Sequence, residues 1–192
     1  MDTIQIHKLS SSNLDFLSTY LENQILKAEK QKKKDVIQIT KSITGKTEIS
    51  AEQWQILNLA HCYLLEAGLQ GDITNSAIEI WRYRLFGERI SSPLTKHRDS
   101  YGLLFGPVNT VIFYLRKDKT VKGGNLEVYR AVLALEPIAT YDCSAGNVLV
   151  FEGSVVHKVE PLLGTGIRDC IVVQMRCQLR GQSPLADAYR GA

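Results

Sequence analysis

The spacing of hydrophobic and polar positions changes once along the chain. Between residues 13 and 36, leucine and isoleucine recur three or four positions apart, which is the spacing of one face of an α-helix. A second helical run follows Ser50, which stands three residues before Gln53 as in a helix-capping box, and a glycine at position 68 ends it. We therefore expect residues 1–75 to form a helical N-terminal part.

From residue 77 to residue 178 the apolar residues alternate with polar ones. Segments such as IEIWRYRLF (78–86) and NVLVF (147–151) have the period of two that is typical of β-strands, and turns containing glycine or proline separate them. Helices followed by many short strands favour a mainly β fold, a β-sandwich or jelly roll buttressed by helices, over a parallel α/β sheet. We expect one domain over 1–192, with its jelly-roll core at 77–178 and a tail at 179–192.

Composition narrows the class of protein further. The 192 residues, 44% of them hydrophobic, suffice for one domain with a substantial core. Lys and Arg number 23 and Asp and Glu number 20, so net charge gives no reason to expect a nucleic-acid partner. The four cysteines show no C-x-x-C spacing, the first residues do not resemble a secretory signal, and Gly106 and Pro107 interrupt the longest apolar run. We expect a reduced cytoplasmic protein without a membrane segment.

The His-Arg-Asp triplet at 97–99 fits two chemistries. A protein kinase carries its catalytic base in such a triplet, but it also needs an Asn five residues after the Asp and a D-F-G triplet. Position 104 is a leucine, and the chain contains no D-F-G. A metal site instead requires His97 and Asp99 on one face of a strand and Arg98 on the other, which agrees with the polar residues that flank them. We therefore prefer the metal site.

Further residues in a fixed order support this interpretation. A glycine pair at 123–124 precedes a strand, His157 lies in the strand-like VVHKV, and Arg168 follows eleven residues later. Two histidines and a carboxylate are the ligand set of non-haem Fe(II) oxygenases, and an arginine can hold a dicarboxylate with forked hydrogen bonds. Over residues 80–177, the order H-x-D, GG-x-L, G-x-x-L-x-F, H, P, G-x-R resembles the Fe(II)/2-oxoglutarate-dependent dioxygenase superfamily, particularly its prolyl-hydroxylase-like branch.

The resemblance implies a double-stranded β-helix and a set of site residues. His97, Asp99 and His157 would bind Fe(II) and form the catalytic centre, and Arg168 would anchor the cosubstrate 2-oxoglutarate, with O2 as the second cosubstrate. Tyr83, on the strand before the triplet, would help to hold 2-oxoglutarate. The halogenating branch has Gly or Ala in place of the carboxylate, so Asp99 favours hydroxylation over halogenation.

The implied activity is oxidation, with hydroxylation preferred, of an unactivated C–H bond in a small-molecule or amino-acid-like substrate, releasing succinate and CO2. Two alternatives stay open: a hydroxylase of prolyl or other protein side chains, and a non-catalytic cupin-like module that binds a metal or ligand. A third, nucleic-acid oxidation, is weakened because Gln174 stands where the nucleic-acid-demethylating branch has a second arginine. Loops at 86–96 and 116–122 are candidates for closing over a small substrate. The sequence does not indicate the oligomeric state.

Two further expectations concern residues that share one face of a predicted strand. Arg168, Cys170, Val172, Gln174 and Arg176 share one face of an ideal strand, which is polar enough to line a pocket. Arginines on outward faces of strands are usually solvated, and we expect this of Arg82, Arg84 and Arg98.

Overall fold

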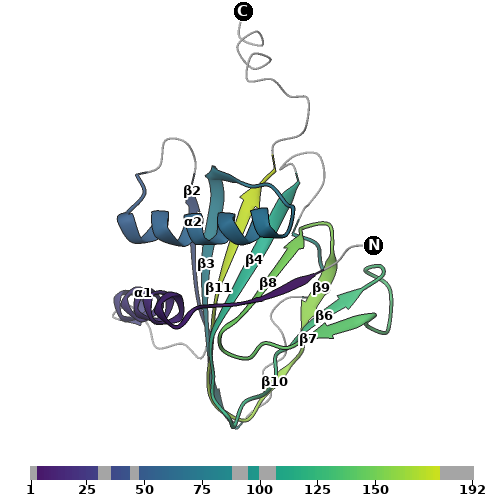
Figure 1. The fold of residues 1–192 in the computed structure, drawn as a ribbon. Coiled ribbons are helices and arrows are strands. Elements are labelled where there is room, and N and C mark those ends of the chain that lie inside the picture. Colours follow the sequence, from purple (N-terminus) through teal and green to yellow (C-terminus); the bar gives the residue numbers. More distant parts are fainter. Residues whose placement is uncertain (1–3, 30–35, 44–47, 88–94, 100–106, 178–192) are drawn as a thin grey trace, which may run out of the picture.

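The computed structural model describes residues 4–29, 36–43, 48–87, 95–99 and 107–177, and these residues form a mainly β jelly roll with two helices (Figure 1). The elements are β1 (Gln5–Lys8), α1 (Ser11–Glu29), β2 (Val36–Ile43), α2 (Ala51–Glu66), β3 (Asp72–Phe86), β4 (Val108–Lys117), β5 (Lys122–Gly123), β6 (Leu126–Tyr129), β7 (Ala139–Tyr141), β8 (Asn147–Glu152), β9 (Val156–Val159), β10 (Leu162–Leu163) and β11 (Thr165–Arg176).

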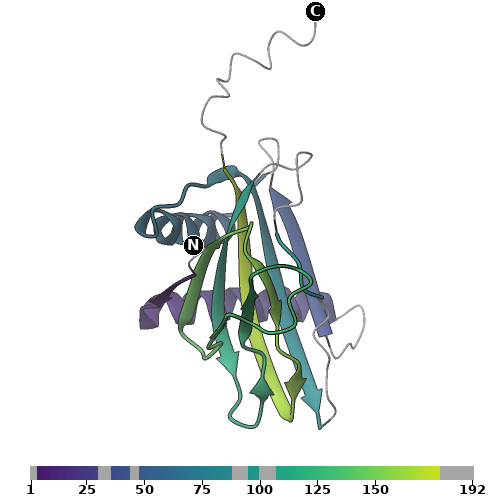
Figure 2. The ribbon, with the colours of Figure 1, turned by 90° about the vertical axis from the view of Figure 1, so that its right-hand side faces the viewer.

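Two antiparallel sheets make up the jelly roll. The large sheet has the strand order β1-β8-β4-β11-β3-β2 and the small sheet the order β7-β6-β9, while β10 and β5 pair separately. In Figure 2 the small sheet lies in front of the large one, so the two sheets face each other. This arrangement confirms the predicted fold class.

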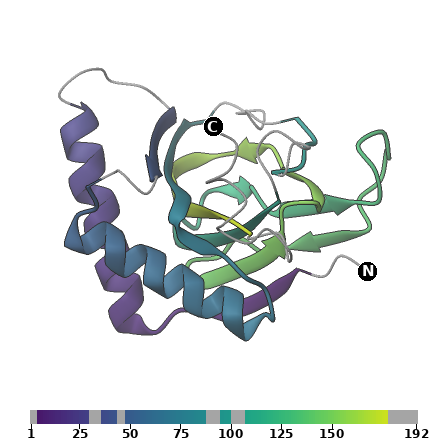
Figure 3. The same cartoon turned by 90° about the horizontal axis from the view of Figure 1, so that it is seen from above.

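The two helices cover the outer face of the large sheet, away from the small sheet (Figure 3). The capping box predicted for α2 is present: the Ser50 hydroxyl accepts from the backbone N–H of Gln53 at 3.3 Å, and the Gln53 side chain accepts from the Ser50 N–H at 3.0 Å. Leu17 and Leu21 of α1 and Leu57 of α2 are fully buried against the sheet in one apolar core. Neither described helix has the length and apolar character needed to cross a bilayer.

The alternation predicted for β3 is present, and it distributes the side chains of this strand between two cores. Ile78 and Ile80 belong to the core beneath the helices, whereas Trp81, Tyr83 and Leu85 belong to a second core between the two sheets. Because successive side chains on a strand point to opposite faces, one strand can pack against the helices on one face and line the space between the sheets on the other.

The N-terminal part is not purely helical, which corrects the prediction for residues 1–75. The first helix ends at Glu29, and β2 pairs with β3 along the edge of the large sheet, while β1 pairs with β8 at the opposite edge. Both strands carry weak alternation, and Ile6 of β1 is 55% exposed. Pairing with neighbours distant in the sequence stabilises them. Residues 30–35 and the predicted tail at 179–192 lie outside the described residues.

The prediction that Arg82 is solvated was wrong. Its side chain is 4% exposed and donates to both carboxylate oxygens of Asp169 at 2.8 Å, and also to Glu22 of α1. Arg82 shares the face of β3 that is covered by the helices, so its charge is balanced by these two acids. Arg98, in contrast, is exposed as predicted.

Candidate functional site

A cavity of about 430 Å³ lies between the inner faces of the two sheets. Its wall on the large sheet comes from alternate residues of β3, β4 and β11, and its opposite wall comes from β6, β9 and the segment 95–99. The described residues that line it are Gln38, Glu79, Trp81, Tyr83, Thr95, His97, Asp99, Thr110, Ile112, Tyr114, Leu126, His157, Val159, Arg168, Cys170, Val172 and Gln174. Every site residue predicted from the sequence is among them.

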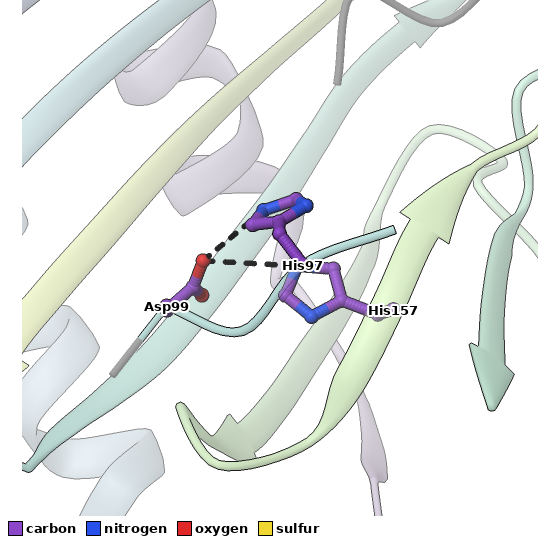
Figure 4. A group of neighbouring side chains, drawn as sticks. All are labelled: His97, Asp99 and His157. Carbon is purple, nitrogen blue, oxygen red and sulfur yellow. Dashed lines mark ion pairs between the residues drawn. The ribbon is translucent and has the colours of Figure 1, made fainter. Parts of the chain in front are cut away.

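His97, Asp99 and His157 converge at one point of this cavity (Figure 4). The Nε2 atoms of His97 and His157 lie 3.4 and 3.7 Å from Asp99 Oδ1, and one ligand atom from each residue lies within 4.8 Å of the others. The backbones of the two histidines exchange hydrogen bonds of 3.0 and 2.9 Å. Residues 95–99 thus form a single β-bridge to β9 in place of the predicted strand. The side chains of His97 and Asp99 nevertheless both face the cavity, as expected.

Backbone carbonyls orient both imidazole rings. His97 Nδ1 lies 2.8 Å from the carbonyl oxygen of Thr95, and His157 Nδ1 lies 3.0 Å from that of Val155. Because a carbonyl can only accept, each Nδ1 carries the proton in the neutral ring, and the lone pair is on Nε2, which faces Asp99. This is the tautomer in which a histidine can bind a metal through Nε2.

Thr110 of β4 holds the carboxylate of Asp99. Its hydroxyl donates to Asp99 Oδ2 at 2.5 Å, which leaves Oδ1 directed at the two imidazoles. Burial acts to raise the pKa of Asp99, but the His97 hydrogen bond, the charge of His157 and the Thr110 hydroxyl outweigh it and lower the pKa. The three side chains therefore present two nitrogens and an ionised oxygen that could hold a divalent cation.

The three titratable groups differ in environment. Burial lowers the pKa of His157, which favours its neutral form. For His97 burial acts in the same direction, but the hydrogen bond that the protonated ring donates from Nε2 to Asp99 outweighs it and raises the pKa. Protons therefore compete with a metal mainly at His97.

Arg168 lies in the same cavity without a charged partner. Its side chain is 2% exposed, donates to the Gly124 carbonyl at 3.2 Å and contacts Cys170 Sγ at 3.8 Å, while its Nε has no hydrogen-bond partner. Among the described residues, no carboxylate forms an ion pair with it. Burial raises the pKa of the Cys170 thiol to about 11, so this neighbour is neutral at pH 7. An unpaired buried cation is costly, and a bound anion would relieve that cost.

Two tyrosine rings enclose the Arg168 guanidinium. Its central carbon lies 5.5 Å from the ring centroid of Tyr83 and 5.3 Å from that of Tyr114. Burial raises the pKa of both phenols, so both are neutral, and the Tyr114 hydroxyl is buried without a partner. Tyr83 was predicted to contribute to this site, whereas Tyr114 and Thr110 were not. The alternation in TVIFY places the side chains of positions 110 and 114 on one face and is the signal that could have identified them.

Some expected contributors to the cavity do not reach it. Arg176 is exposed and does not line the cavity, although Cys170, Val172 and Gln174 do. The loop at 116–122 is fastened to the start of β11, since Asp118 and Ile167 exchange hydrogen bonds of 3.0 and 2.9 Å, and it contributes no lining residue. Residues 88–94 of the other expected loop lie outside the described residues.

Comparison with known proteins shows the fold. No protein-family model matches the chain, and no curated protein matches it. Among solved structures, it is similar to a Pseudomonas putida prolyl-4-hydroxylase (18% identity, TM-score 0.59, covering 93% of each chain). It is also similar to a prolyl hydroxylase from Trichoplax adhaerens in complex with a hypoxia inducible factor peptide fragment (16%, 0.59, 90% of this chain and 83% of that one). A third is AviO1 from Streptomyces viridochromogenes Tue57 (18%, 0.60, 95% and 92%).

These likenesses and the cavity define a class of structure. The chain has a prolyl-hydroxylase-like jelly roll, and in the structure that fold carries a His-x-Asp…His group able to hold a metal. Sequence identities of 16 to 18% to these structures establish similarity of fold only and do not determine the substrate.

Proposed function

We propose that the protein is an Fe(II)- and 2-oxoglutarate-dependent oxygenase that hydroxylates an unactivated C–H bond of a small-molecule or amino-acid-like substrate. The observation that carries this proposal is the joint presence, in one cavity, of a convergent His-Asp-His group and a buried arginine without an anionic partner. A structural metal site needs no such arginine. A site for a metal-chelating dicarboxylate needs both.

His97, Asp99 and His157 would hold the metal. Two nitrogens and one oxygen on one side of an ion leave its remaining positions open to a bidentate 2-oxo acid and O2. Bound Fe(II), with 2-oxoglutarate and O2, supplies the oxidising power for hydroxylation, and the cosubstrate is released as succinate and CO2. Asp99 occupies the position at which a halogenase would need space for halide, so the proposed reaction is hydroxylation.

Arg168 and its neighbours would hold the far carboxylate of 2-oxoglutarate. The forked donors of Arg168 suit a carboxylate, and its Nε has no other partner. The Tyr114 hydroxyl, also without a partner, can donate to the same anion, while the two tyrosine rings exclude water and so strengthen these hydrogen bonds. Tyr83 contributes its ring to this enclosure.

The experiment is an anaerobic titration of the Fe(II)-loaded protein with 2-oxoglutarate, following the visible charge-transfer band of a chelated 2-oxo acid. We expect a saturable band in the wild type, an affinity for 2-oxoglutarate reduced about 100-fold in Arg168→Ala, and wild-type behaviour in the control Arg98→Ala. Absence of the band in folded, iron-loaded wild type would contradict the proposal and favour a cupin-like binding module without turnover.

A second candidate function is the same hydroxylation reaction with a protein side chain as the substrate. A prolyl residue or another protein side chain would be hydroxylated in place of a small molecule, and the Trichoplax neighbour, which is described with a bound peptide fragment, favours this candidate. Succinate release stimulated by proline-containing peptides, with an added mass of one oxygen on the peptide, would support it over the small-molecule proposal.

A further inference from the structure

Glu79 is the other carboxylate that lines the cavity besides Asp99, among the described residues. It lies on β3, on the same inward face as Trp81 and Tyr83, and is half-buried. The indole Nε1 of Trp81 donates to Glu79 Oε2 at 3.0 Å, which fixes the direction of the carboxylate. No lysine, arginine or histidine of the described residues forms an ion pair with it.

Glu79 and Arg168 lie toward opposite ends of the cavity. In the strand register Arg168 is opposite Tyr83, and Glu79 lies four residues further along β3, a separation of about 13 Å at about 3.3 Å per residue. A five-carbon dicarboxylate held at Arg168 is shorter than this separation. Glu79 therefore borders space that the cosubstrate does not fill, and the group that fills it belongs to the substrate.

The surroundings of Glu79 suit a cation. In the strand register Glu79 lies opposite Val172 of β11 and Thr40 of β2. The cavity-lining residues Gln174 and Gln38 are its diagonal neighbours on these strands, and they are neutral and can both donate and accept hydrogen bonds. The indole ring beside Glu79 is the aromatic side chain that attracts cations most strongly. Burial raises the pKa of Glu79 and the charge of Asp99 adds to this, while the Trp81 hydrogen bond and the charge of His97 oppose it. A bound cation would offset the cost of keeping this carboxylate ionised.

We propose that Glu79 is a specificity-determining residue that binds a cationic nitrogen of the substrate, an ammonium or guanidinium group, beside the indole of Trp81. This inference rests on the proposed function, because it assigns Arg168 to the cosubstrate. It narrows the substrate class to small molecules that carry a basic nitrogen, with the oxidised carbon between that nitrogen and the metal group. Neutral and acidic molecules of the same size are excluded.

The test uses two probes of matched size, cyclopentylamine and cyclopentanol, with the full chain at pH 7.5. Binding of each probe is measured by ligand-observed NMR for the wild type, Glu79→Gln and the exposed control Glu136→Gln, both metal-free and loaded with Fe(II) and 2-oxoglutarate without oxygen. Glutamine keeps the size of the side chain and an acceptor for Trp81 but removes the charge. We expect the wild type and Glu136→Gln to bind the amine about 10-fold more tightly than the alcohol, and Glu79→Gln to lose this preference.

Two results would overturn the proposal: equal binding of the two probes by the wild type, or an unchanged amine preference in Glu79→Gln. Failure of the proposed function is seen separately, because the charge-transfer band reports the metal and 2-oxoglutarate, whereas the amine preference is also measured without them. The band should persist in Glu79→Gln, since Glu79 is not among the residues proposed to hold the metal or 2-oxoglutarate.

Discussion

Two buried polar atoms in this cavity have no hydrogen-bond partner among the described residues, and this indicates the kind of ligand they would bind. Arg168 Nε and the Tyr114 hydroxyl are buried without a hydrogen-bond partner, and buried polar atoms in folded proteins are rarely left so. Both atoms belong to residues that line the same cavity. Their unmet hydrogen-bonding capacity is consistent with a bound carboxylate.

Replacement of Tyr114 by phenylalanine separates a binding role from a structural one. Because the hydroxyl has no hydrogen-bond partner among the described residues, its removal should leave the free energy of unfolding unchanged within about 0.5 kcal/mol or increase it. The affinity for 2-oxoglutarate should fall about 10- to 100-fold, since a hydrogen bond to a charged group is lost. Urea unfolding and the anaerobic titration measure the two quantities, and unchanged affinity would remove Tyr114 from the cosubstrate site.

Thr110 should act on the metal through Asp99. Thr110→Val keeps the shape of the side chain and removes the hydroxyl that donates to Asp99 Oδ2, so the carboxylate loses its fixed orientation. Such partners of metal ligands are typically worth 10- to 100-fold in metal affinity, and we expect a loss in that range for Fe(II) or for Co(II) as a spectroscopic substitute. Thr140→Val, at an exposed position of β7, is the matched control. Equal metal affinity in both variants would contradict this role.

At the scale of elements, the turn between β5 and β6 shapes the anion site. Gly124 has φ +78°, and a Cβ there would lie 2.5 Å from Leu162 Cδ2 and 3.1 Å from Arg168 Nε. The glycine therefore meets two requirements, a left-handed backbone and space for the guanidinium. The sequence placed this glycine pair just before a strand, and the contact of Gly124 with Arg168 emerges from the pairing of the strands.

Gly124→Ala should therefore impair both stability and cosubstrate binding. Gly146→Ala is the matched control, because Gly146 also has a positive φ, +86°, but a Cβ there would have no neighbour within 4 Å. Both variants should lose about 1 kcal/mol of unfolding free energy to backbone strain, and Gly124→Ala should lose more through the contact with Leu162. Only Gly124→Ala should weaken 2-oxoglutarate binding. Equal binding by the two variants would show that the guanidinium does not need this space.

Across the whole molecule, a partly buried ion-pair network joins the helical layer to the sheet behind the cavity. Arg82 of β3 is paired with Asp169 of β11 and with Glu22 of α1, and Asp169 is the neighbour in sequence of Arg168. On one strand, therefore, Asp169 is anchored toward the helices while Arg168 points into the cavity.

Arg82→Leu should destabilise the protein without removing the metal ligands. It leaves Asp169, which is 3% exposed, buried without its cation, and loss of one partner of a buried pair typically costs about 3 to 5 kcal/mol. Arg98→Leu, at an exposed position, should change the unfolding free energy by less than about 0.5 kcal/mol. Urea denaturation measures both, and equal stability of the two variants would show that the network contributes little.

The sequence by itself determined the features that follow from local spacing. The period of two placed Trp81 and Tyr83 opposite Arg82, the capping box located the start of α2, and the ordered motifs identified the three metal-binding candidates and Arg168. The strand faces and the helix start were confirmed because each depends on a few neighbouring residues, whereas the roles of the metal-binding candidates and of Arg168 stay predictions.

Tertiary structure alone decided what depends on pairing between distant segments. The strands β1 and β2 form because they complete the edges of a sheet, Arg82 is buried because α1 brings Glu22 to it, and Thr110 meets Asp99 across the cavity. That Arg168 and Glu79 form no ion pair within the described part of the chain is likewise a property of the whole cavity. A sequence lists charges without their neighbours, and the free energy of a buried charge depends on those neighbours.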